Sequence, residues 1–300
     1  MIWLIISLVG YFLLAIAGLT DKILLKKSIP EPVVYAFYIS LLSLIALLLI
    51  PFGFEFPGFH LLLISFAAAF IFTLALLLFF SLLKKEEASR VIPLVSGLSP
   101  VFVFILSRNF LGESLSLKQI LAFIIILIGG LLISLEKGKK KESLFQKTFF
   151  LGLIASFLFA VFYVLSKYVY LHHSFISGFI WIKIGGGLSA LILFLIPTLR
   201  KKILQKTGKP DLQTGKVFIF GQSCGALSNL LINYAVAIGP LSLINALQGV
   251  QYGFLFLMIL VFSRKFPNLL EEKTTPLIVL QKTLSIILIS SGILLLFLKI

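Results

Sequence analysis

Amide and phenol side chains recur at helical spacing in two neighbouring apolar segments, 217–237 and 241–262. The first segment carries Gln222, Asn229 and Asn233, and the second carries Asn245, Gln248 and Tyr252. At about 100° per residue, these spacings place each set on one stripe of a helix. An uncompensated amide in hydrocarbon costs a few kcal/mol, so both stripes must face protein or water. They either bond to each other as helix glue, worth about 0.6 kcal/mol per bond, or line a polar pocket.

Two segments further upstream add a tyrosine and a lysine to this candidate set. Tyr163 shares one helix face with Ser156 and Lys167 in 149–171, and it lies deeper than Lys167. Lys183 lies about eight residues, or roughly 12 Å, from the nearer end of its own segment. An ammonium near the bilayer centre costs about 3 kcal/mol, so it must face water, a carbonyl or an anionic group. Substrate-anion binding and a structural bond to carbonyls both remain open for Lys183.

The predicted substrate-binding set combines these side chains from four segments. It consists of Tyr163, Lys183, Gln222, Asn229, Asn233, Asn245, Gln248 and Tyr252.

Catalytic and metal-binding patterns are absent from the sequence. The chain has one cysteine, Cys224, and its three histidines, His60, His172 and His173, do not form a metal-ligand pattern. No nucleophile–base–acid set or phosphate-cradling glycine loop occurs, and no Asp or Glu lies deep in an apolar segment. We therefore predict neither an enzyme nor a cofactor or metal site, and coupling to protons through a buried carboxylate is unsupported.

The composition excludes an ordinary soluble domain. Hydrophobic residues make up 60% of the 300 residues and charged residues only 12%, whereas about a quarter of positions are charged in soluble domains. The net charge of +15 comes from Lys and Arg in short clusters between apolar runs, with no basic face of interleaved aromatics. The sequence therefore predicts a lipid bilayer as the partner, and no nucleic acid.

Ten apolar runs are long enough to cross a bilayer, which takes about 20 residues of helix. They cover about 2–20, 33–54, 60–83, 88–106, 117–135, 149–171, 175–199, 217–237, 241–262 and 277–298. Lipid offers no partner for free backbone groups, so runs of this length must be helices. The predicted fold is an all-α membrane protein with ten transmembrane helices.

An internal repeat emerges when residues 145 positions apart are compared. The stretch AIAGLTDKILL (15–25) aligns with AVFYVLSKYVY (160–170), which places Lys22 opposite Lys167. With five spans in each half, the second half must run opposite to the first, as in many transporters. We predict a first repeat at 1–135, a basic linker at 136–148 and a second repeat at 149–300.

The hairpin formed by 88–134 carries a pattern of prolines and glycines. It contains Pro93 and Pro100 in its first helix, Gly112-Glu113 in its connector and Gly129-Gly130 near the far end of its second helix. This order resembles the fourth and fifth helices of the EamA repeat in the drug/metabolite transporter superfamily. The resemblance covers essentially the whole chain. It implies two inverted five-helix repeats around a midplane cavity lined by spans 1, 3, 4, 6, 8 and 9.

The distribution of basic residues predicts an orientation. One set of alternate connectors holds 21 Lys and Arg residues, while the opposite side holds four. By the positive-inside rule, both termini then face outward. The resembling family usually has its termini inside, so the two arguments conflict, and we favour the charge count.

These observations predict a secondary transporter in the plasma or inner membrane of the cell. Its substrate would be a small polar or amphipathic metabolite, such as an amino acid, moved by alternating access. A flippase for a lipid-linked anion, which Lys183 would suit, and a non-transporting structural protein are the alternatives. The oligomeric state is left open between a monomer and a homodimer.

Overall fold

A computed structural model describes residues 2–25, 31–85, 88–134, 145–204, 212–263 and 276–297. Helices occupy nearly all of these ranges, and the described residues contain no strand. The predicted all-helical class is therefore confirmed. Most of the predicted linker 136–148 and the side chains of Lys22 and Pro93 lie outside the described residues.

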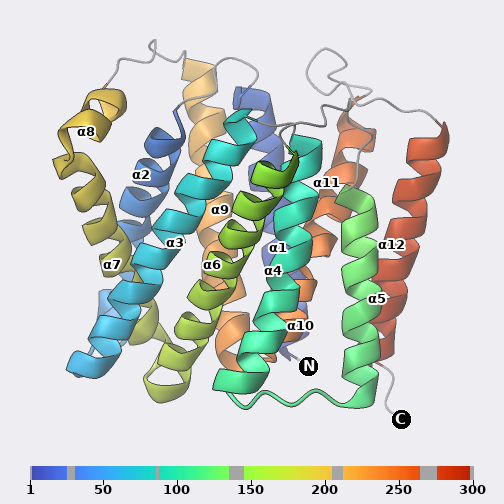
Figure 1. Cartoon of the computed structure of the whole chain (residues 1–300), viewed down its shortest axis with the longest axis horizontal. Coiled ribbons are helices and arrows are strands. Elements are labelled where there is room, and N and C mark those ends of the chain that lie inside the picture. The colour runs from blue at the N-terminus through green and yellow to red at the C-terminus, as the bar shows by residue number, and fades with distance from the viewer. Residues whose placement is uncertain are drawn as a thin grey trace. The chain divides into compact units, whose positions relative to one another are not determined.

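The first half of the chain supplies five α-helices and a 3₁₀ helix (Figure 1). They are α1 (Ile2–Leu25), α2 (Pro32–Leu42), the 3₁₀ helix η1 (Ser43–Phe52), α3 (Phe59–Lys85), α4 (Ala88–Phe110) and α5 (Leu117–Ser134). The second half supplies α6 (Phe145–His172), α7 (Phe175–Leu195), α8 (Pro197–Ile203), α9 (Leu212–Ile238), α10 (Leu241–Ala246), α11 (Gln248–Ser263) and α12 (Pro276–Phe297). The predicted span 241–262 is thus divided between α10 and α11, and α8 adds a short helix after α7.

Among the residues that the structure describes, seven segments are long and apolar enough to cross a membrane. They are Ile2–Thr20, Pro32–Phe52, Phe59–Lys85, Phe149–His172, Phe175–Leu195, Leu241–Met258 and Leu280–Phe297. Two shorter apolar stretches lie in α4 and α5, at Leu94–Phe110 and Leu117–Leu132. The 27-residue helix α9, which carries three of the predicted amides, is not among the seven.

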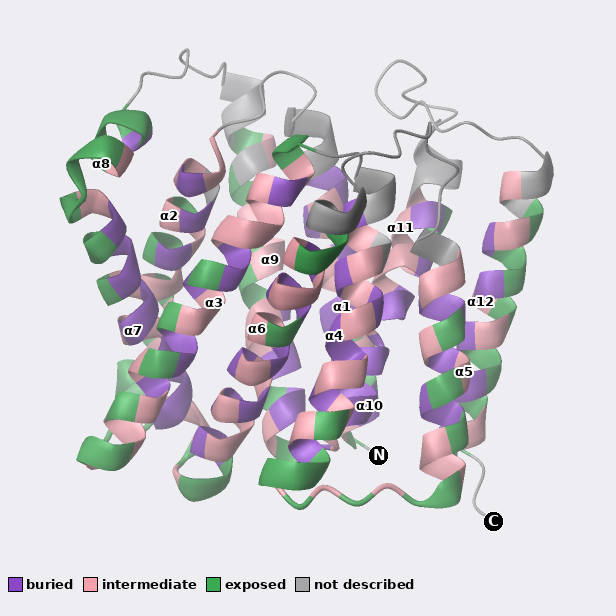
Figure 2. Ribbon diagram, viewed as in Figure 1, coloured by how far each residue is buried: buried purple, intermediate pink, exposed green. Residues whose placement is uncertain are grey.

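Many large apolar residues are exposed, while a set of polar residues is buried. Large apolar side chains point outward from most helices: the exposed fraction is 75% for Leu48 and 68% for Leu195. Figure 2 shows exposed positions recurring along the length of α3, α5 and α12. Serines, Asn233 and Asn245 are buried instead. An apolar exterior around polar interior groups fits lipid as the surrounding solvent, and supports a multi-pass membrane protein.

The described helices form two compact units, and each unit draws on both halves of the chain. Unit 1 comprises 1–29, 114–137 and 209–300, so it contains α1, α5 and α9 to α12. Unit 2 comprises 30–113 and 138–208, so it contains α2, η1, α3, α4 and α6 to α8. This division in space differs from the predicted division along the sequence into two repeats, which stays a prediction.

In unit 1, α1 packs against α9 and α11, and α5 packs against α12 and α11. Glycines permit the closest approaches. A Cβ built on Gly221 of α9 would overlap the Thr20 hydroxyl of α1, and one built on Gly249 would lie 2.6 Å from the Cα of Gly130. Small residues are typical of such helix crossings in membranes. The glycines of the GxxxG-spaced pairs at 221 and 249 therefore have a packing role.

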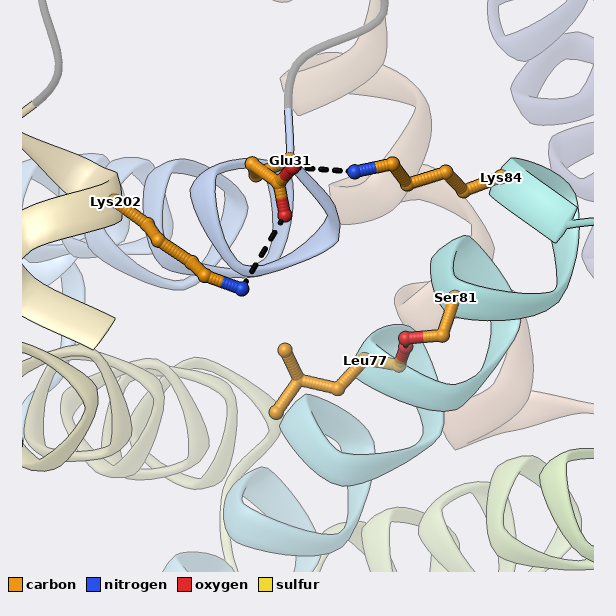
Figure 3. Close-up of polar contacts among 5 residues, drawn as sticks. All are labelled: Glu31, Leu77, Ser81, Lys84 and Lys202. Atoms are coloured by element: carbon orange, nitrogen blue, oxygen red, sulfur yellow. Dashed lines mark hydrogen bonds and ion pairs between the residues drawn. The ribbon is translucent and has the colours of Figure 1, made fainter. Parts of the chain in front are cut away.

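In unit 2, α6 packs against α3 and α4, and α7 packs against α2, η1 and α3. A carboxylate outside the apolar spans ties three of these elements together (Figure 3). Glu31, directly before α2, accepts a hydrogen bond from Lys84 at the end of α3, and Lys202 of α8 lies 3.6 Å from its other oxygen. The Lys84 ammonium holds the pKa of the Glu31 carboxyl below its ordinary value.

The connector between α4 and α5 follows from its local sequence. Gly112 has a positive φ of 66°, and the next residue, Glu113, donates its N–H to Ser107 O at 3.2 Å to close the end of α4. Ser116 and Gln119 then form a reciprocal cap at the start of α5. The Ser116 N–H donates to the Gln119 Oε1 (2.9 Å), and the Gln119 N–H donates to the Ser116 hydroxyl (3.3 Å).

Candidate functional site

The structure divides the eight predicted site residues between the two units. Unit 1 holds six of them on three helices, with Gln222, Asn229 and Asn233 on α9, Asn245 on α10, and Gln248 and Tyr252 on α11. Unit 2 holds the other two, Tyr163 on α6 and Lys183 on α7. Within each unit, the hydrogen bonds of these side chains determine whether their polar groups are available to a ligand.

The amides of α9 lie beside the stripe with which this helix packs on α1. That stripe includes Gly221, which meets Thr20, and Ser228, whose hydroxyl donates to Gly10 O at 2.8 Å. Gln222 and Asn229 each follow a residue of this stripe, so they are turned about 100° away from α1. Both are half-buried. The amide stripe therefore flanks the α1–α9 packing without forming it.

Asn233 and Asn245 are buried near the turn that joins α9 to α10, and both bond within their own helices. The Asn233 Nδ2 donates to the backbone oxygen of Asn229 at 2.8 Å and lies 3.3 Å from its Oδ1. The Asn245 Nδ2 donates to Leu241 O at 3.2 Å. Their exposed fractions are 4% and 3%. These two amides are therefore partly satisfied by the backbone of their own helices.

The break between α10 and α11 is a single residue, Leu247, whose backbone stays in the right-handed helical region. At this point the bonding tightens to an i to i+3 contact, with the Val250 N–H donating to Leu247 O at 2.9 Å. The last carbonyls of a helix lack intrahelical partners. One of them, Ile244 O, accepts a hydrogen bond from the buried Tyr11 hydroxyl of α1 at 2.8 Å. Gly249, just past the break, lies against Gly130 of α5. The break is thus held from both α1 and α5.

Three glutamines near these elements keep free carboxamides. Gln222 of α9 and Gln248 and Gln251 of α11 are half-buried, and within the described ranges their side chains make no hydrogen bond. A Cβ built on Gly18 of α1 would lie 3.9 Å from the Gln251 Nε2, an ordinary contact distance, so this amide lies beside α1. An unpaired amide at membrane depth costs several kcal/mol. These groups must therefore meet water or a ligand.

The glutamines of the two amide stripes lie on helices that share α1 as a neighbour. Helices α9 and α11 each pack against α1, but among the described residues they do not pack against each other. Direct amide pairing needs helices in contact. Both α9 and α11 therefore contact α1, and Gln248 is the first residue of α11.

In unit 2, Tyr163 and Lys183 have different surroundings. Tyr163 is half-buried beside the Phe162 ring, and its hydroxyl has no hydrogen-bond partner among the residues that the structure describes. The Lys183 ammonium lies 4.9 Å from the centre of the Phe179 ring, and the Lys183 backbone oxygen accepts from the Ser43 hydroxyl at 3.1 Å. A cation over an aromatic face is partly stabilised there, so Lys183 is not an isolated charge.

Residues 54–56 and the start of α7 form a polar network that is fully accounted for by structure. The Ser177 hydroxyl donates to Glu55 O at 2.7 Å and accepts from the Glu55 N–H at 3.1 Å, and Trp181 Nε1 donates to Glu55 O at 2.8 Å. Since a hydroxyl has one proton to donate, His173 Nε2, 3.0 Å away, must donate to Ser177. The network anchors a loop.

Sequence reasoning did not assign three residues that the structure brings forward. Tyr11 and Gln251 belong to the α1–α11 side of unit 1, and only tertiary packing relates them to the predicted amides. Lys282, in α12, is 5% exposed, and its ammonium lies 4.6 Å from the centre of the Phe256 ring. Lys282 is the seventh residue of α12, so, like Lys183, it lies inside an apolar helix and not at its end. The count of 21 basic residues on one set of connectors includes Lys282.

The part of the chain that the structure describes contains no set of metal-binding side chains. No group of three or more His, Cys, Asp or Glu side chains is placed to hold an ion there. Cys224 is half-buried on α9.

Comparison with known proteins agrees with the fold and with the hairpin pattern. A solved structure, described only as the crystal structure of a protein, superposes with a TM-score of 0.70 at 13% sequence identity, and the match covers 97% of this chain and 94% of that one. At this identity the likeness shows the fold alone. A search among curated proteins finds no match. The model of the EamA-like transporter family matches residues 1–135. The resemblance indicated by the hairpin is thereby confirmed: over residues 1–135 this chain is similar to the EamA-like transporter family.

Proposed function

We propose that this protein is a secondary transporter that moves a small polar or amphipathic metabolite, such as an amino acid, by alternating access. The observation that carries the proposal is the set of half-buried, unbonded carboxamides on α9 and α11 in unit 1. Amides can donate and accept hydrogen bonds, so they recognise polar groups of either kind without requiring a fixed charge. The tightened turn at Leu247, between α10 and α11, lies directly before Gln248.

The proposed architecture is ten spans in two inverted five-helix repeats. The packing supports this architecture because the first helix of each half packs against helices of the other half. The first helix of the first half, α1, packs on α9 and α11 of the second half, in unit 1. The first helix of the second half, α6, packs on α3 and α4 of the first half, in unit 2. A two-fold related pair of repeats is expected to exchange equivalent contacts in this way.

The proposed location is the plasma or inner membrane of the cell, with both termini outside. The excess of Lys and Arg on one set of connectors supports this orientation. The buried position of Lys282 removes one residue from that excess and leaves the asymmetry large.

Transport into proteoliposomes tests the function. The assay would follow uptake and counterflow of labelled amino acids and related metabolites by the whole protein. In Gln248→Met the side chain keeps its length and loses its amide, and we expect transport to fall at least tenfold, the equivalent of about 1.4 kcal/mol. The control, Leu257→Met, changes an exposed apolar residue of the same helix and should transport normally.

The same assay separates the alternatives. Equal transport by Gln248→Met and Leu257→Met would overturn the assignment of the amides. Absence of flux across the metabolite panel, together with scrambling of a fluorescent anionic lipid that Lys183→Gln abolishes, would instead identify a lipid-anion flippase. No flux of either kind would indicate a structural protein.

A further inference from the structure

The short helix α8 presents basic residues directly beyond the apolar end of α7. Arg200, Lys201 and Lys202 are all exposed, and we call them the basic ledge. The connector from 200 to 216 contains six basic residues and one acidic residue. A cluster of this density next to a membrane span carries a strong positive potential.

The ledge has a defined position because α8 is docked. Ile196 is extended, with ψ of 115°, and Pro197 starts the new helix at its first position. Ile203 is buried, and Leu199 packs with Ala36 and Leu193. Leu199 and Ile203 are four residues apart, so they share one face, and the basic side chains point elsewhere. Lys202 is also held by Glu31 (Figure 3).

Directly before the ledge, the surface of α7 is suited to acyl chains. Leu191, Ile192 and Leu195 are exposed, with exposed fractions of 52%, 47% and 68%. The Arg200 guanidinium lies 5.8 Å from the centre of the Phe194 ring, at the point where the apolar surface ends. A hydrocarbon-facing surface and cations therefore meet within about one helical turn of α7 and α8.

We propose that the basic ledge binds the headgroup phosphate of an anionic membrane lipid whose acyl chains lie along the exposed face of α7. A soluble anion would meet the charges alone, whereas a lipid satisfies the charges and the apolar face together. Arg200 and Lys201 supply most of the attraction, because Lys202 already shares the Glu31 carboxylate. This inference requires only that the protein is embedded in a bilayer, and it is independent of the transported substrate.

Thermal unfolding of the whole protein in detergent micelles tests this, with phosphatidylglycerol or phosphatidylcholine titrated in. Phosphatidylglycerol should raise the unfolding midpoint of the unmodified protein, and phosphatidylcholine should not. In the pair Arg200→Gln, Lys201→Gln, the apparent affinity for phosphatidylglycerol should fall roughly 30-fold, since each basic residue near a lipid surface contributes about 1 kcal/mol. The control pair Arg108→Gln, Lys118→Gln loses the same charge around the α4–α5 connector and should keep the response.

Two further arms decide the identity of the ligand. The charge-preserving pair Arg200→Lys, Lys201→Arg should retain the response. Its retention would show that the neutral pair loses the response through its missing charges and not through substitution at these two positions. Glycerol 1-phosphate, which has the headgroup charge and no acyl chains, should not stabilise the protein. An equal response of the neutral and control pairs, or stabilisation by glycerol 1-phosphate as large as that by the lipid, would overturn the proposal.

Discussion

At the scale of single residues, the polar groups that the structure describes differ in whether the protein itself satisfies their hydrogen bonds. Buried serines such as Ser156 and Ser189 donate to the backbone one turn earlier, at 2.7 and 2.9 Å, and so remain satisfied in an apolar setting. Tyr11 does the same across helices by bonding Ile244 O. The glutamines at 222, 248 and 251 are not satisfied in this way, although they lie in helices next to lipid. Their amides are therefore the residues best placed to meet a solute.

The Tyr11 hydroxyl offers a specific test at this scale. Tyr11→Phe keeps the ring and its packing but leaves the Ile244 carbonyl at the helix break without this donor. We expect the free energy of unfolding to fall by about 1–2 kcal/mol, measured by thermal or denaturant unfolding in detergent. The control Tyr38→Phe removes a hydroxyl from a residue that is 48% exposed and should change nothing. A stable Tyr11→Phe protein would mean that the bond does not support the break.

At the scale of elements, two contacts organise the helices of unit 1 around the α10–α11 break. One is the Tyr11 bond from α1, and the other is the glycine-on-glycine crossing of α5 and α11. The second contact is backbone against backbone, so neither side can yield by rotating a side chain. The position of Gln248, one residue before Gly249, depends on that crossing.

Alanine substitution at the crossing should be destabilising. In Gly249→Ala the new Cβ would lie 2.6 Å from the Gly130 Cα, and overpacking of this kind costs about 1–3 kcal/mol. In the control Gly225→Ala the nearest atom is the Ala17 Cβ at 3.6 Å, an ordinary contact, and the helix propensity of alanine should add up to about 1 kcal/mol. Unfolding midpoints should move in opposite directions. A shift of the same sign in both variants would contradict the crossing.

The Glu31 cluster links α2, α3 and α8 and should make stability depend on pH. Its hydrogen bond with Lys84 keeps the Glu31 pKa below the ordinary value of 4.5. A carboxyl with a lowered folded-state pKa stabilises the fold above its ordinary pKa, and this contribution is lost as the pH falls through the folded value. The unfolding midpoint of Glu31→Gln should therefore be lower than that of the unmodified protein at neutral pH, with the difference shrinking upon acidification.

The matched control for this cluster is Glu55→Gln. Glu55 is exposed, and its backbone rather than its carboxylate makes the bonds to Ser177 and Trp181. Its unfolding curve should follow that of the unmodified protein at every pH. A constant difference between Glu31→Gln and the unmodified protein down to pH 3 would show that the ion pairs contribute nothing.

At the scale of the whole molecule, the sequence was informative about helices and weak about their partners. Hydropathy alone predicts the all-helical class, because the backbone in lipid has no other way to satisfy its hydrogen bonds. Hydropathy also predicts one span over 241–262, which agrees with the apolar segment Leu241–Met258, but the apolar residues Ala246 and Leu247 give no signal of the tightened turn between α10 and α11. Helical periodicity places Gln222 and Asn229 on one stripe, but it cannot show that α9 and α11 both pack against α1.

The exchange of first helices between the halves of the chain also constrains how the protein is made. Helix α1 leaves the ribosome long before α9 and α11, its packing partners, have been synthesised. The Tyr11 hydroxyl and the glycine face of the nascent α1 therefore stay uncovered in the bilayer until the last third of the chain is inserted. A prematurely terminated product would contain α1 without its packing partners. The uncovered polar face of α1 would then distinguish this product from the complete protein in membrane quality control.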